Sequence, residues 1–196
     1  MIGKSRKQEL GFTVLEVTIV VLIVGAVVAF AAPRITNAMR EYRLNLAVRQ
    51  INDLIQRAKT QAMSDNKNVT LRIDTANRRA GIVVRDSSNN EVRTDYIPLP
   101  QGVIFSLPAN VAAPMTNAPY ASSISFPAQG TSTTVFQQDF NSRGFPAVAT
   151  PGTINAIYLT NNRSYRALTL TSVGGVRTWV WQTNQWVNTR TAHSTS

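Results

Sequence analysis

The hydrophobic pattern of the chain changes twice, and each change marks the start of a new predicted element. Residues 12–32 form a nearly continuous apolar run with one charged side chain, Glu16. An α-helix rises 1.5 Å per residue, so a helix over this run measures about 31 Å, close to the thickness of a bilayer's hydrocarbon core. The pattern therefore predicts a transmembrane helix over residues 12–32.

From residue 33 the apolar positions recur every three or four residues, the period of an amphipathic helix with one buried stripe. We expect this helix to cover residues 33–66, because Asp65 and Asn66 favour a turn. Gly25 and Pro33 are predicted points of helix flexibility, since glycine has low helix propensity and proline removes a backbone donor. The recurring apolar positions are Ile35, Met39, Tyr42 and Leu46, then Leu44, Val48, Ile51, Ile55, Ala58 and Ala62.

After Lys67 the hydrophobic period falls to two, which is typical of β-strands. The predicted fold class is α+β: a long N-terminal helix, half transmembrane and half amphipathic, packed on an antiparallel β head. The head covers residues 67–188, and a flexible tail follows at 189–196. Turns are expected at 74–77, 86–90, 161–162 and 174–175, and a proline-rich loop at 108–121. The predicted strands are 69–73, 80–84, 92–99, 103–107, 123–126, 134–136, 155–160, 166–171, 176–181 and 186–187.

The composition supplies little for catalysis or metal binding. The chain has no cysteine, and its one histidine, His193, lies in the polar tail. A serine hydrolase triad or a zinc site needs histidine in a packed cleft, so we expect no enzyme, no cofactor and no metal site. Residues 86–91 offer oxygen ligands, but they lack the glycine and the carboxylate set of a calcium loop. A polar hairpin turn is the favoured interpretation.

The charges around the apolar run predict its orientation in the membrane. Lys4, Arg6 and Lys7 precede the run, which favours a cytoplasmic N-terminus, although the arginines at 34, 40 and 43 weaken the asymmetry. The formal net charge is +10. Such a charge has two possible interpretations: it attracts nucleic acid or anionic lipid, or it only keeps the chain soluble. Composition favours neither interpretation.

The charge of Glu16 within the apolar run has two possible explanations. A carboxylate within a membrane helix costs roughly 2.5–3.5 kcal/mol at the centre, and less near the edge. Glu16 is therefore either close enough to the interface to stay hydrated or paired with a positive group of another subunit.

The sequence Ala29-Phe30-Ala31 also fits a secretory cleavage site, and cleavage there would release a soluble protein. The run is longer than an ordinary signal core of 7–15 residues, which counts against that cleavage.

The stretch KQELGFTVLEVTIVVLIV, at residues 7–24, resembles the processing motif of type IV prepilins and pseudopilins. The resemblance implies that residues 1–11 are a leader that prepilin peptidase removes after Gly11. It implies that the new N-terminus, Phe12, is N-methylated. It also implies that Glu16 pairs with the N-terminal amine of a neighbouring subunit, and that the helix loosens near Gly25 and Pro33 in the filament.

The head resembles the GspH/FimT group, which contains minor pseudopilins of type II secretion and minor pilins of type IV pili. The matching segments are AKTQAM at 58–63, VTL at 69–71, SF at 125–126, FNSRGFP at 140–146 and IYLT at 157–160. This implies a single-pass inner-membrane protein with a periplasmic head that assembles into a filament. Its implied partners are other pilins or pseudopilins, the prepilin peptidase/N-methyltransferase and the inner-membrane assembly platform.

Some FimT-like pilins bind DNA through a C-terminal Gly-Arg-any-Arg motif. The matching place here is 174–177, where Arg177 is present and the first arginine is absent. Arg163, Arg166 and Arg190 lie near it in sequence, so they are the candidate DNA-binding residues, with a solvated basic face as the alternative. Three tryptophans at 179, 181 and 186 suit stacking on bases. Trp179 and Trp181 share one strand face by their spacing of two, and packing of that face on the core is favoured.

Overall fold

The computed structural model describes residues 13–86, 88, 90–107, 129, 131–146, 155–182 and 185–189. The chain divides into two compact units, Met1–Met39 and Arg40–Ser196. One helix, α1 (Val14–Asp65), passes from the first unit into the second. The predicted transmembrane and amphipathic segments are thus one continuous helix.

Both ends of α1 are defined by local hydrogen bonds. The hydroxyl oxygen of Thr13 accepts the backbone N–H of Glu16 at 3.2 Å, the arrangement of an N-terminal cap. At the other end Asn66 has a positive φ of 49°, and the N–H of Lys67 donates to the carbonyl of Ala62 at 3.2 Å. This pattern closes a helix in a left-handed turn, which confirms the predicted end. The helix is uninterrupted at Pro33.

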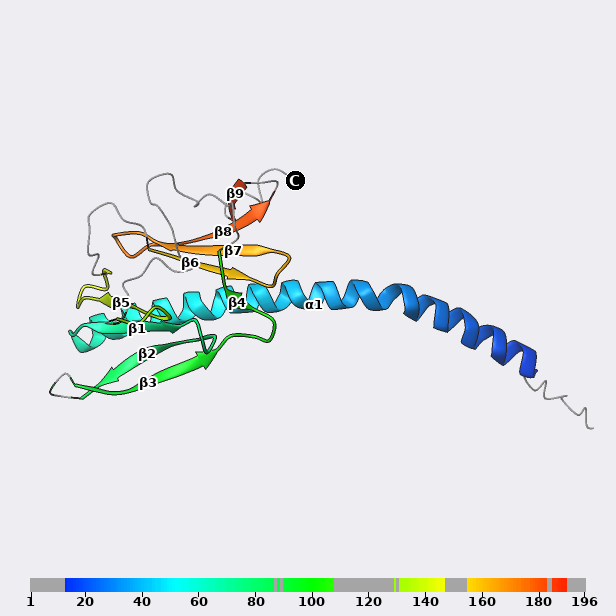
Figure 1. The fold of residues 1–196 in the computed structure, drawn as a ribbon, viewed down its shortest axis with the longest axis horizontal. Helices are drawn as coiled ribbons and strands as arrows, with labels where there is room; N and C mark the ends of the chain where they lie inside the picture. The colour runs from blue at the N-terminus through cyan, green and yellow to red at the C-terminus, as the bar shows by residue number, and fades with distance from the viewer. Residues whose placement is uncertain are drawn as a thin grey trace, which may run out of the picture. The chain divides into compact units, whose positions relative to one another are not determined.

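The strands form two separate antiparallel sheets, which Figure 1 shows along the second half of α1. The first sheet has the order β3-β2-β1-β5, and the second has the order β4-β6-β7-β8-β9. The strands of the first sheet are β1 (Val69–Asp74), β2 (Arg79–Arg85), β3 (Glu91–Pro98) and β5 (Val135–Phe140). Those of the second are β4 (Ile104–Phe105), β6 (Asn155–Thr160), β7 (Tyr165–Leu170), β8 (Val176–Gln182) and β9 (Gln185–Asn188).

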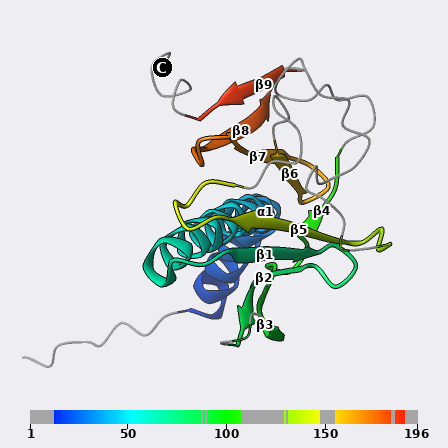
Figure 2. The ribbon, with the colours of Figure 1, turned by 90° about the vertical axis from the view of Figure 1, so that its left-hand side faces the viewer.

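The main hydrophobic core lies between the two sheets, around the second half of α1. Figure 2 shows the helix between β1 and β5 on one side and β6 and β7 on the other. Burial of these apolar side chains is the main favourable term that holds the head together. The helix contributes Leu44, Ala47, Val48, Ile51, Leu54, Ile55, Ala58 and Ala62. The sheets contribute Val69, Leu71, Ile73, Ala80 and Phe140 from one side and Ile157, Leu159, Leu168 and Leu170 from the other.

The helix buries only part of its predicted apolar stripe. All six positions of the second set, from Leu44 to Ala62, are buried. Ile35, Met39 and Tyr42 of the first set are exposed, with 61%, 47% and 62% of their surface accessible. The stripe is therefore covered only where the two sheets flank it.

Most predicted strands differ from the structure by one residue at an end, and two differ by more. The strand predicted at 103–107 is only Ile104–Phe105, because only these two residues pair with β6. The strand predicted at 134–136 runs to Phe140, because it pairs with β1 along the whole of that strand. The strand predicted at 123–126 and the loop predicted at 108–121 lie outside the described residues.

Candidate functional site

The membrane-facing candidate is the first part of α1, whose apolar side chains are exposed. Val14, Leu22 and Phe30 have 82%, 74% and 79% of their surface accessible. Among the described residues, α1 is the one helix long and apolar enough to cross a membrane, and its most apolar stretch has no buried residue. Such a surface requires lipid or other protein around it.

Glu16 lies in the first turn of this exposed segment. It lines a shallow hollow of about 270 Å³ together with Val17, Val20 and Val21. Its backbone N–H is capped by Thr13, so the sequence Thr-Val-Leu-Glu at 13–16 has the pattern of a capping box. This helix start at Thr13 was not identified in the sequence analysis. Gly11 and Phe12 lie outside the described residues.

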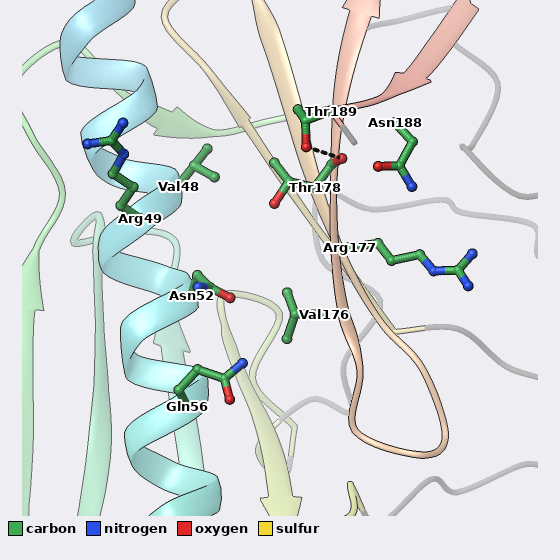
Figure 3. Close-up of a pocket in the computed structure, with 9 residues that line it drawn as sticks. All are labelled: Val48, Arg49, Asn52, Gln56, Val176, Arg177, Thr178, Asn188 and Thr189. Atoms are coloured by element: carbon green, nitrogen blue, oxygen red, sulfur yellow. Dashed lines mark hydrogen bonds between the residues drawn. The ribbon is translucent and has the colours of Figure 1, made fainter. Parts of the chain in front are cut away.

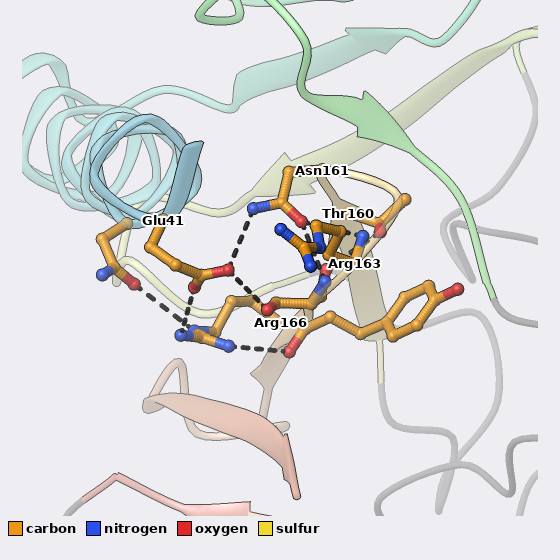
Figure 4. Close-up of polar contacts among 8 residues, drawn as sticks. Glu41, Thr160, Asn161, Arg163 and Arg166 are labelled. Atoms are coloured by element: carbon orange, nitrogen blue, oxygen red, sulfur yellow. Dashed lines mark hydrogen bonds and ion pairs between the residues drawn. The ribbon is translucent and has the colours of Figure 1, made fainter. Parts of the chain in front are cut away.

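In the head, Glu41 joins α1 to the turn between β6 and β7, as Figure 4 shows. Its carboxylate accepts hydrogen bonds from the Asn161 amide at 3.1 Å and from the Ser164 hydroxyl, and it forms an ion pair with Arg166 at 3.3 Å. The Nε of Arg166 also donates to Asn45 at 3.3 Å. Four polar contacts therefore attach α1 to this part of the second sheet.

Arg166 is the least accessible of the described candidate DNA-binding arginines. Its side chain is 14% exposed. Burial lowers its pKa below the usual arginine value, and the charge of Glu41 acts in the opposite direction. Because its guanidinium is used by the ion pair with Glu41, Arg166 has a structural role.

The other described arginines of the predicted DNA site line two different cavities. Arg163 lies on a cavity of about 490 Å³ that Arg40 and Arg43 also line. Arg177 lies on a second cavity, of about 320 Å³, which also has Arg49 in its lining. Figure 3 shows the Arg177 side chain pointing away from α1. Arg190, like His193 in the tail, lies outside the described residues.

A buried arginine on β1 was not identified from the sequence. Arg72 is 6% exposed and forms an ion pair and a two-pronged hydrogen bond with the carboxylate of Glu91 on β3. A further bond of 2.8 Å runs from Arg72 to the hydroxyl of Thr94. The hydrogen bond from Arg72 lowers the pKa of Glu91, and the same contact raises the pKa of Arg72. The partner positions are 19 residues apart, so no local pattern indicates the pair.

The predicted polar turn between β2 and β3 is confirmed. The carboxylate of Asp86 accepts the backbone N–H of Asn90 at 2.8 Å, and Glu91 is engaged by Arg72. These carboxylates thus have partners within the protein. No cluster of three or more metal-ligating side chains occurs among the described residues.

Trp179 packs on a small second core, as predicted, whereas Trp181 contacts the ring of Trp186, with 5.3 Å between the ring centroids. Trp179 and Trp186 lie against a buried cluster of Ala156, Tyr158 and Ala167. The indole N–H of Trp179 donates to the hydroxyl of Thr169 at 2.9 Å. Its half-buried ring is therefore oriented by the sheet.

Comparison with known proteins identifies the family. Residues 47–174 match the family described as type II transport protein GspH. Because this match covers most of the chain, the chain belongs to the GspH family. It is a member of the type IV pilin and pseudopilin superfamily, a group of structural filament subunits that includes the minor pilins of type II secretion systems and type IV pili.

Two solved structures resemble the chain at low sequence identity. The type IV minor pilin FimU of Pseudomonas aeruginosa strain PAO1 has a TM-score of 0.47 and 13% identity, over 75% of this chain and 94% of that chain. The minor pseudopilin EpsH of the Vibrio cholerae type 2 secretion system has a TM-score of 0.45 and 11% identity, over 70% of this chain and 97% of that chain. A search of curated proteins found no match.

Proposed function

We propose that the mature protein begins at Phe12, after prepilin peptidase removes residues 1–11 and its new N-terminus is methylated. In this proposal the helix stays in the inner membrane, the head faces the periplasm, and the subunit joins other pilins or pseudopilins through an assembly platform. It acts as a minor, non-enzymatic subunit. The observation that carries the proposal is the exposed apolar half of α1, with its one acid, Glu16, in the first turn.

The chemistry of assembly follows from charge in an apolar environment. A carboxylate and an ammonium each cost free energy in lipid, and they offset one another when they meet. In the proposal the Phe12 amine of one subunit meets Glu16 of its neighbour as the apolar helices come together. Small side chains at 25, 26, 29, 31 and 32 allow close packing of those helices.

The decisive variant is Glu16→Gln in the full-length protein, expressed in cells that assemble the filament. Glutamine keeps the polar group that a capping box uses but removes the charge. We expect incorporation into filaments, measured by cross-linking, to fall at least about tenfold, because an unpaired ammonium in lipid costs more than the roughly 1.4 kcal/mol of a tenfold change. Membrane flotation should be unchanged. Equal incorporation of Glu16→Gln and wild type would refute the pairing.

A matched control is Glu9→Gln, which removes an acid that lies within the predicted leader. This variant should incorporate like wild type. Intact-mass analysis of the mature protein tests the processing step separately. A start at methylated Phe12 supports the proposal, whereas a soluble product that starts after Ala31 supports ordinary secretion.

A second candidate function is DNA binding by the head. Its support is the exposed side chain of Arg177, on a cavity that Arg49 also lines. Phosphate contacts by arginine make affinity fall with salt. The double variant Arg49→Gln/Arg177→Gln should therefore weaken binding of a DNA duplex and reduce its salt dependence. No binding by the wild-type protein at low salt would end this candidate.

A further inference from the structure

One edge of the first sheet is open. The strand order is β3-β2-β1-β5, so β3 is an edge strand, and Figure 1 shows it as the outermost strand on the side away from β5. It covers eight residues, and among the described strands it pairs with β2 alone. An edge strand presents a row of backbone N–H and C=O groups with which another extended segment can pair.

The register of β2 and β3 shows which backbone groups of β3 lie on the open side. The N–H of Leu99 donates to the carbonyl of Arg78 at 2.8 Å, directly beyond the paired residues of the two strands. Antiparallel pairs alternate between hydrogen-bonded and non-hydrogen-bonded positions, so the backbone of Asp95 bonds to β2. The N–H and C=O groups of Thr94 and Tyr96 therefore point to the open edge, where the described part of the chain supplies no partner for them.

A groove of about 440 Å³ lies beside this edge, between α1 and the inner face of β2 and β3. Its apolar lining comes from Leu54 of α1 and from Ile82, Val84 and Ile97 of the sheet. The three sheet residues are only partly buried, so they have apolar surface left to cover. A strand added next to β3 would lie about 4.8 Å from it, and every second side chain would face this groove.

Arg57 supplies an unpaired charge to the groove. It lines the groove from α1, its side chain is exposed, and it forms no hydrogen bond or ion pair with any described residue. The carboxylate of Asp95, which also lines the groove, already forms an ion pair with Arg93 at 2.9 Å. A carboxylate on an incoming segment would therefore complement Arg57.

We propose that the β3 edge binds an extended segment of a partner protein, which joins the first sheet as a new edge strand. Backbone hydrogen bonds to Thr94 and Tyr96 supply the pairing, while alternate apolar side chains in the groove and one carboxylate at Arg57 supply the selectivity. A second copy of this chain fits less well, because its own β3 carries Arg93 and Asp95 on the groove face. The proposal concerns the head alone, and it does not depend on how the N-terminus is processed.

The test uses the full-length protein in a neutral detergent and a fluorescein-labelled peptide, STVTVTETS, whose valines and glutamate share one strand face. The variant Thr94→Pro removes an N–H from the open edge, a position where an edge strand tolerates proline. The matched control Thr94→Val keeps that N–H and removes only the hydroxyl that accepts a hydrogen bond from Arg72. By fluorescence anisotropy, we expect Thr94→Pro to bind the peptide at least about fivefold more weakly than Thr94→Val.

Two further measurements separate backbone pairing from contact between side chains. Binding of the peptide to the wild type should slow hydrogen exchange at the amides of Thr94 and Tyr96. The same peptide with methylated backbone amides should not bind, because it keeps the side chains but has no N–H donors. Arg57→Gln should weaken binding at least about threefold, whereas Arg143→Gln, at an exposed position on the loop after β5, should not.

Three results would overturn the proposal: no binding of the peptide by the wild type, equal binding by Thr94→Pro and Thr94→Val, or equal binding of the methylated peptide. Self-association that protects the same amides without peptide would assign the edge to a second copy and would also overturn it. Circular dichroism checks folding, and the comparison of Arg57→Gln with Arg143→Gln provides the test if Thr94→Pro does not fold.

Discussion

The ammonium group of Lys59 donates a 2.7 Å hydrogen bond to the backbone carbonyl of Gly174, 115 residues further along the chain. This contact joins the last part of α1 to the turn between β7 and β8. Gly174 is buried with a φ of +76°, and a side chain there would meet the Gly144 carbonyl at 3.1 Å. The helix and two loops therefore meet closely at this end of the head.

Replacing Lys59 with methionine tests the strength of this contact. The change keeps an unbranched side chain but removes the charged donor, which leaves the Gly174 carbonyl without that partner. We expect the free energy of unfolding to fall by about 1.5–3 kcal/mol, the range for hydrogen bonds that involve charged groups. Thermal unfolding of the full-length protein in detergent measures the change. Lys67→Met, at an exposed position just past the helix, is the control and should alter the stability little. Equal effects would contradict a specific role for Lys59.

The ion pair of Arg72 and Glu91 predicts a dependence of stability on acidity. The hydrogen bond from Arg72 lowers the pKa of Glu91 in the folded state below the ordinary value of 4.5. The unfolded chain therefore binds this proton more readily than the folded chain. The stabilisation is fully present above about pH 4.5 and is lost as pH falls through the lower folded-state pKa.

The variant Glu91→Gln isolates this contribution. It should reduce stability at neutral pH and flatten the decline of stability in acid, since the glutamine does not titrate. Unfolding temperatures measured between pH 7 and pH 3 give both quantities. Asp53→Asn, at an exposed position on α1, should leave the pH profile of the wild type unchanged. A Glu91→Gln profile parallel to that of wild type would show that other acids carry the dependence.

Alanine substitutions at Gly81 and Gly102 distinguish the effect of steric crowding on stability from the effect of backbone strain. An alanine at Gly81 would place its Cβ 2.3 Å from the Asp95 carbonyl oxygen, so β3 would have to move away from β2. An alanine at Gly102 would meet no atom within 4 Å, but it would have to adopt a φ of +82°. We expect Gly102→Ala to cost about 1–2 kcal/mol and Gly81→Ala to cost more, because overpacking adds to lost strand pairing. Thermal unfolding of the two variants side by side checks this order, and a reversed order would contradict it.

Local patterns predicted most of the elements of the fold. The turn at Asn66, the hairpin at Asn161–Asn162 and the turn at Gly174 each depend on residues that tolerate a positive φ, and their sequences indicate this directly. The limits of β5 were not predictable in this way. That strand reaches Phe140 because β1 supplies a partner for each residue, which is a tertiary effect.

Long-range pairing also decides where the arginines of the head lie. Arg163 and Arg166 are three residues apart and were predicted to share a function. Glu41 engages Arg166, whereas the turn places Arg163 on the cavity that Arg40 and Arg43 also line. Arg72 has a regular strand position, and its burial depends on Glu91 from another strand. Sequence periodicity predicts which face of a strand or helix a residue occupies. It does not predict which charged side chain from a distant segment will pair with that residue.

The placement of α1 between two separate sheets has a mechanical consequence. Each sheet packs its own apolar face on the same stretch of helix, and among the described strands none pairs across from one sheet to the other. Tension applied along the helix is therefore divided between two layers that act in parallel. A subunit pulled through this helix should resist extraction of the helix until both layers give way together.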